Sequence, residues 1–138
     1  NVSSSGMASN RKRMNAISSN IANAQTTRTV EGGPYRRKEV VFGSEPARNN
    51  FSDILEGEMG ANIQKVHATE VLSVNEAPIL KYEPGHVDAN EKGYVAYPNV
   101  NVMKEMADMI SASRSYEANI SALNTAKSMA MKSLEIGR

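Results

Sequence analysis

The sequence contains no cysteine and no tryptophan, and only 5% of its 138 residues are aromatic. Without cysteine, the chain can form no disulfide, no thiolate nucleophile and no cysteine-bound metal site. Aromatic side chains supply much of the buried area of a large core, so their scarcity argues against an extensive self-contained core. The eight methionines are instead suited to adaptable packing between helices.

Long apolar runs and catalytic motifs are also missing. No stretch of 18 apolar residues exists, and no continuous apolar segment has the form of a secretory signal peptide, so we expect no direct membrane insertion. His67 and His86 have no second histidine at ligand spacing, and the turn 88–93 lacks the glutamate that completes a calcium loop. Neither a phosphate-binding loop nor a G-x-S-x-G nucleophile motif is present. We therefore expect no catalytic residue, no metal and no cofactor.

The net charge of +1 hides an uneven distribution along the chain. Residues 1–38 contain seven basic residues and one acidic residue, whereas residues 39–101 contain four basic and ten acidic residues. This pattern fits complementary contacts between neighbouring copies or with partners, and it equally fits solvated surface charge. The basic runs 11–13 and 36–38 have no aromatic platform beside them, so we expect no nucleic-acid partner.

A regular stripe runs through the C-terminal third of the chain. Steps of four and three residues alternate along it, which is the spacing of a coiled-coil seam. The stripe consists of Val102, Met106, Met109, Ser113, Tyr116, Ile120, Leu123, Lys127, Ala130 and Leu134. Uninterrupted by proline or glycine, a helix from Val102 to about Ile136 is roughly 50 Å long. A compact chain of this length is less than about 40 Å across, so the seam is expected to need partners outside the chain. The alternative is a helix packed only on its own domain.

A second seam lies near the N-terminus, on a helix of about 20 residues. Its positions are Met7, Asn10, Met14, Ile17, Ile21 and Ala24. Gly32-Gly33-Pro34 prevents this helix from continuing. We therefore expect three parts: an N-terminal helix within residues 1–30, a β-rich middle segment 31–98 and a C-terminal helix within residues 99–138.

The middle segment has short strand candidates at residues 38–42, 61–74, 78–82 and 94–97, and a flexible loop at 43–60. Asn99 and Asn101 are candidate caps for the last helix. The expected fold is mainly α with a small β-rich insert. Its two terminal helices pair as an antiparallel coiled coil.

Several short motifs follow one another in a fixed order along the chain. Their central residues are Asn20, Ile21, Ala22, Asn23, Ala24, Pro98, Asn99, Tyr116, Glu117, Ala118 and Asn119. Together these motifs resemble those of bacterial flagellar rod and hook axial proteins. The segments Gly32–Lys38, Tyr82–His86 and Gly93–Asn101 narrow the resemblance to the proximal-rod branch. Hook proteins usually carry a glycine soon after the asparagine-rich motif, where this chain has Thr27-Arg28-Thr29.

The resemblance implies a structural subunit of the rod, the drive shaft that crosses the periplasm inside the basal body and transmits torque. Such subunits surround a central export channel in the periplasm, and they are exported unfolded through the flagellar type III apparatus without a cleaved signal peptide. The implied partners are further copies, other rod proteins, and membrane-ring and rod-adaptor components at the rod base. Two other interpretations are a soluble coiled-coil adaptor that regulates rather than builds, and an enzyme.

Overall fold

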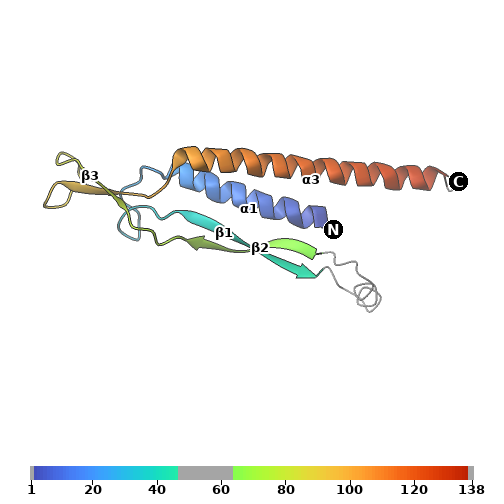
Figure 1. Ribbon diagram of the computed structural model, residues 1–138, viewed down its shortest axis with the longest axis horizontal. Helices are drawn as coiled ribbons and strands as arrows, with labels where there is room; N and C mark the ends of the chain where they lie inside the picture. Colours follow the sequence, from blue (N-terminus) through green and yellow to red (C-terminus); the bar gives the residue numbers. More distant parts are fainter. Residues whose placement is uncertain (1, 47–63, 137–138) are drawn as a thin grey trace.

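The computed structural model describes residues 2–46 and 64–136 of the chain. Along the chain, one helix precedes and one follows two small antiparallel sheets (Figure 1). The elements in order are α1 (Val2–Ala22), β1 (Lys38–Pro46), β2 (Gln64–Ser73), β3 (Ile79–Tyr82), β4 (Tyr94–Tyr97) and α3 (Val102–Ile136). This arrangement confirms a chain with helices at both ends and a small β region in the middle.

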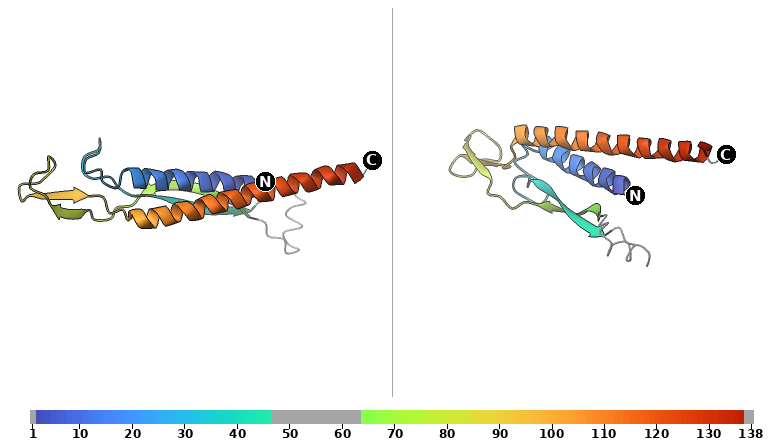
Figure 2. Two further views of the ribbon diagram at one scale, coloured as in Figure 1. Left: turned by 90° about the horizontal axis from the view of Figure 1, so that it is seen from above. Right: turned by 45° about the vertical axis from the view of Figure 1, so that its right-hand side comes forward.

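The elements lie in layers, with α1 between α3 and the β1–β2 hairpin (Figure 1). Helix α1 contacts α3 along one side and both strands of that hairpin along another. The β3–β4 hairpin extends beyond one end of the helices, and the C-terminal half of α3 extends past the N-terminus of α1 at the other end (Figures 1 and 2). The molecule is therefore elongated, and its buried apolar residues lie mostly where α1 is covered on both sides, with Val95 of β4 as a separate buried position.

The two helices run in opposite directions. Gly6, near the start of α1, lies beside Asn119, and Asn20, near its end, bonds Glu105 in the first turn of α3. A Cβ atom on Gly6 would come 3.2 Å from the amide nitrogen of Asn119, so the small residue allows the helices to approach closely here. Regular coiled-coil packing between the helices is not confirmed, although their direction is the expected one.

The face of α3 that is most buried differs from the apolar stripe seen in the sequence. Glu105 and Ala112 are each 1% exposed. The half-buried residues Met109, Tyr116 and Asn119 continue their line at spacings of four and three. Only Met109 and Tyr116 belong to the stripe. The inward face is thus rotated relative to the stripe. The periodicity did not identify this face, because a glutamate and a small alanine occupy its most buried positions.

Helix α3 spans the residues expected from the sequence because its start is well defined. The side chain of Asn101 accepts a hydrogen bond from the backbone N–H of Lys104 at 3.2 Å, which caps the helix. Helix α1 begins at Val2 and ends at Ala22. Just after it, the side-chain amide of Asn23 donates a hydrogen bond to the carbonyl of Ser19 at 2.8 Å. Within the described residues, no helix combines the length and the apolar character needed to cross a membrane.

Strand β1 continues to Pro46, so the loop expected to begin at residue 43 begins later than the sequence suggested. Gly43 pairs with His67, and a Cβ atom at Gly43 would lie 2.6 Å from the hydroxyl oxygen of Thr69. The glycine therefore marks a crowded position within a strand, beside the irregularity between Val41 and Phe42, and not the start of a turn. The remainder of the expected loop, from residue 47 to residue 60, lies outside the described residues.

Candidate assembly interface

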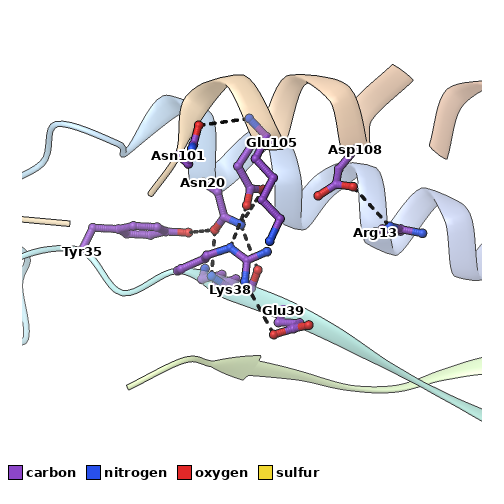
Figure 3. A network of polar contacts seen from close by, with 10 residues as sticks. Arg13, Asn20, Tyr35, Lys38, Glu39, Asn101, Glu105 and Asp108 are labelled. Atoms are coloured by element: carbon purple, nitrogen blue, oxygen red, sulfur yellow. Dashed lines mark hydrogen bonds and ion pairs between the residues drawn. The ribbon is translucent and has the colours of Figure 1, made fainter. Parts of the chain in front are cut away.

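A buried asparagine joins α1, β1 and α3. Asn20 is 1% exposed, and the oxygen and the nitrogen of its side-chain amide each make two hydrogen bonds. Its Oδ1 atom accepts hydrogen bonds from the backbone N–H of Lys38 at 2.8 Å and from the hydroxyl of Tyr35 at 3.0 Å. Its Nδ2 atom donates to the carbonyl of Lys38 at 2.9 Å and to the carboxylate of Glu105 at 3.0 Å (Figure 3). The side chain thus pairs with the edge of β1 as a neighbouring strand would.

The carboxylate of Glu105 is the second centre of this cluster. It is buried, and buried charges are stable only when they are paired and hydrogen-bonded. Arg37 Nε donates to Oε1 of Glu105 at 2.7 Å, while the other carboxylate oxygen accepts from Asn20. This hydrogen bond raises the pKa of the Arg37 guanidinium, and the charge of Glu39 acts in the same direction, whereas burial opposes the shift.

We call the set Ser19, Asn20, Tyr35, Arg37, Lys38 and Glu105 the Asn20 network. Ser19 completes it through a hydrogen bond of 3.0 Å to the Tyr35 hydroxyl. No buried side-chain nitrogen or oxygen among the described residues lacks a partner. A fully satisfied buried network holds its elements in one arrangement, because any displacement leaves polar groups unpaired. The network therefore fixes how the two ends of the chain meet the middle segment.

Two weaker contacts extend this framework. Arg13 and Asp108 form an ion pair of 3.7 Å between α1 and α3, and both side chains are partly exposed (Figure 3). Beyond the end of α1, Thr27 donates a hydrogen bond of 2.8 Å to Asp88, which Arg28 approaches at 3.8 Å. The residues that replace the hook-type glycine thus tie the asparagine-rich motif to the loop between β3 and β4.

The seam residues expected to form the interface differ in their surroundings. On α1, Ile17 is buried and Met7, Met14 and Ile21 are half-buried. On α3, Met109 and Tyr116 are half-buried, whereas five seam residues are exposed: Val102, Met106, Ile120, Leu123 and Leu134. The chain thus covers the seam of α1 and leaves most of the seam of α3 uncovered.

The family-motif residues have different local roles. Asn20 and Pro98 are buried, and Asn23 accepts a hydrogen bond from Thr26 at 3.3 Å beyond the end of α1. Five motif residues are half-buried: Ile21, Asn23, Ala24, Tyr116 and Asn119. The remaining four are exposed: Ala22, Asn99, Glu117 and Ala118. Sequence reasoning missed Tyr35, Arg37 and Glu105 as site residues. Glu105 lies just inside a capped helix start, where an acidic residue is ordinarily attributed to the helix dipole.

No catalytic arrangement accompanies these contacts. Among the described residues, no three side chains of the metal-ligating types gather closely enough to hold an ion. In the Asn20 network the carboxylate of Glu105 bonds the guanidinium of Arg37 and the amide of Asn20, so the chemistry of these groups is that of a structural junction.

Comparison with known proteins decides the family. Residues 1–28 match the model of the flagella basal body rod protein family, and residues 91–136 match that of the C-terminal region of flagellar basal body rod FlgEFG proteins. The FlgC basal-body rod protein of Bacillus subtilis is 43% identical over all of this chain and 95% of its own length. The chain belongs to the FlgC family of flagellar basal-body rod proteins.

Other FlgC relatives are equally well covered. The protein of Borreliella burgdorferi is 42% identical over 99% of this chain and 93% of its own length. That of Salmonella typhimurium is 40% identical over 99% of this chain and 94% of its own length. The resemblance drawn from the motifs is therefore confirmed. Membership in FlgC also confirms a structural rod subunit of the flagellar basal body rather than an enzyme.

Proposed function

We propose that this FlgC-family chain is one subunit in the wall of the rod. Its helices α1 and α3 pair as an antiparallel coiled coil, and the exposed seam of α3 contacts neighbouring subunits. The observation that carries this proposal is the uncovered seam itself. Met106 is 50% exposed and Leu134 is 75% exposed, although both belong to a regular apolar repeat. Such a repeat on a helix surface gains its stabilisation when a second surface covers it.

Fully burying an aliphatic side chain of this size contributes about 1.5 to 3 kcal/mol. Several such residues on one face therefore offer a large favourable contribution that the isolated chain does not use. The neighbours we propose are further copies and other rod proteins, around a channel lined by the terminal helices. Components of the membrane ring and rod adaptor would contact the rod base, and the shaft would transmit torque across the periplasm.

Passage to the rod is part of the same proposal. We propose that the chain travels through the flagellar type III export apparatus without a cleaved signal peptide. The support is the resemblance of the motifs to axial proteins, together with an elongated fold that leaves much of α3 uncovered. In this proposal, the uncovered surface is buried only on assembly.

The test replaces Ile120 or Leu123 with aspartate in a strain that depends on this chain for swimming. A carboxylate in an apolar contact is costly, so we expect both variants to lose rod assembly and motility. Ser121→Asp is the matched control, because Ser121 lies off the seam on the same turn of α3 and is exposed. Normal swimming of both seam variants would refute the seam as an interface, and absence of the chain from purified basal bodies would refute the assembly role.

A further inference from the structure

The part of α3 that extends past α1 has a charged residue inside its apolar face. Every residue from 121 to 135 is exposed, and we call this stretch the free segment of α3. Lys127 lies on the seam between Leu123 and Leu134 and makes no ion pair with any residue in the described part of the chain. A partner that covers this seam must therefore supply a carboxylate as well as apolar surface.

Such a surface exists on the β1–β2 hairpin. Glu39 pairs with Leu72, and Val41 pairs with Glu70 on the next row of the same face. All four side chains are exposed, so carboxylates and aliphatic groups alternate across a small patch that we call the Glu70 face. Glu39 is 3.6 Å from Arg37, whereas Glu70 has no ion pair among the described residues. Glu70 is thus the carboxylate available to an external cation.

The spacings of the two surfaces agree. Leu123 and Lys127 are four residues apart on a helix, which places them about 6 Å apart along its axis. Glu70 and Leu72 are two residues apart on a strand, which separates them by about 6.6 Å. An apolar side chain and a charge therefore recur at nearly the same distance on both surfaces. The segments also carry opposite charge, since residues 39–101 are acidic and the free segment has two lysines and one glutamate.

We propose that the free segment of α3 docks on the Glu70 face of a second copy of this chain, with Lys127 pairing with Glu70 and Leu123 covering Leu72. The contact joins different surfaces of the two copies, so it can repeat from copy to copy and build an open helical assembly. This inference rests on the proposed function, in which the seam of α3 is an interface. It names the surface that the free segment of α3 contacts on the neighbouring copy.

The test exchanges the two charges in the full chain, in a strain that depends on it for swimming. Lys127→Glu and Glu70→Lys each place like charges together, so we expect each to lower the number of basal bodies per cell at least about tenfold. The double variant restores an attractive pair between copies, and we expect it to recover to within about twofold of the parent. Lys132→Glu combined with Glu70→Lys is the control, because Lys132 lies on the opposite side of α3 and restores nothing.

A second measurement uses the natural absence of cysteine. Cells carry one gene with Leu123→Cys and one with Leu72→Cys, and isolated basal bodies are oxidised. We expect a disulfide-linked pair of the two variants, and much less of it when Ser121→Cys replaces Leu123→Cys. The proposal is overturned if the charge exchange fails to restore assembly, if either single reversal is harmless, or if Leu123→Cys links only to another protein.

The two proposals fail separately. If the aspartate variants at Ile120 and Leu123 block assembly but the charge exchange restores nothing, the seam is an interface with a different partner. If Ile120→Asp swims normally while Leu123→Asp blocks assembly and the charge exchange restores it, the Glu70 contact stands without the wider seam.

Discussion

Replacing Asn20 with alanine removes the side-chain amide that joins α1, β1 and α3, and it is expected to lower the stability of the fold. In Asn20→Ala, the backbone N–H and C=O of Lys38 and one oxygen of Glu105 lose their partners, while Tyr35 keeps Ser19. Each of the three losses costs about 1 kcal/mol or more, and the better helix propensity of alanine returns about 0.5 kcal/mol. We expect the free energy of unfolding to fall by about 2 to 3 kcal/mol.

The assay is thermal unfolding of the purified full chain, followed by circular dichroism. For a chain of this length, the expected loss lowers Tm by about 10 °C. Asn15→Ala is the matched control, because Asn15 is an exposed asparagine of the same helix with no hydrogen bond to a described residue. Both variants gain the same helix propensity, so their difference isolates the Asn20 network. Equal melting temperatures for the two variants would refute the reasoning.

Two further predictions concern the β3–β4 hairpin. Gly93 has φ of 79°, and a Cβ atom there would lie 2.8 Å from the ring of Tyr82, so Gly93→Ala is expected to cost about 1 to 2 kcal/mol of unfolding free energy. Urea denaturation of the purified variant measures this loss. Gly85→Ala serves as the control, because a Cβ atom at Gly85 meets nothing within 4 Å, and equal urea midpoints for the two variants would contradict the prediction. The hydrogen bond of 3.0 Å from Tyr97 to the Glu83 carboxylate raises the pKa of that phenol, because the carboxylate accepts from the neutral form. In an ultraviolet titration, Glu83→Gln should shift the ionisation of one tyrosine to lower pH, and an unchanged curve would argue against this hydrogen bond in solution.

Much of the architecture was predictable from local signals in the sequence. Asn101 and the absence of a helix breaker before Gly137 define α3, and Pro98 marks the end of β4. Strand β1 was underestimated because Gly43 has the sequence character of a turn, whereas its role depends on Thr69, a residue far along the chain. A signal that depends on a distant neighbour is invisible in a local window.

The candidate site was predictable only in part, for the same reason. The motif identified Asn20, but its partners come from β1 and α3, and nothing local connects Arg37 with Glu105. The apolar repeat on α3 identified mainly residues that are exposed in the single chain, together with the half-buried Met109 and Tyr116, and it missed the inward positions of Glu105 and Ala112. Hydrophobic periodicity reports which residues are apolar, and it does not report which face a neighbouring helix covers when that face is polar or small.

The contact between Asn20 and Glu105 spans 85 positions of sequence. A chain that appears one end first, from a ribosome or a narrow pore, has α1 and β1 available long before the start of α3. Until that turn arrives, the amide of Asn20 lacks its carboxylate partner and Arg37 has only the exposed carboxylate of Glu39, so the layers cannot close in their final form. The turn of α3 that carries Glu105 is therefore needed before α1, β1 and α3 can join through the Asn20 network. A chain that has not yet presented this turn lacks that junction.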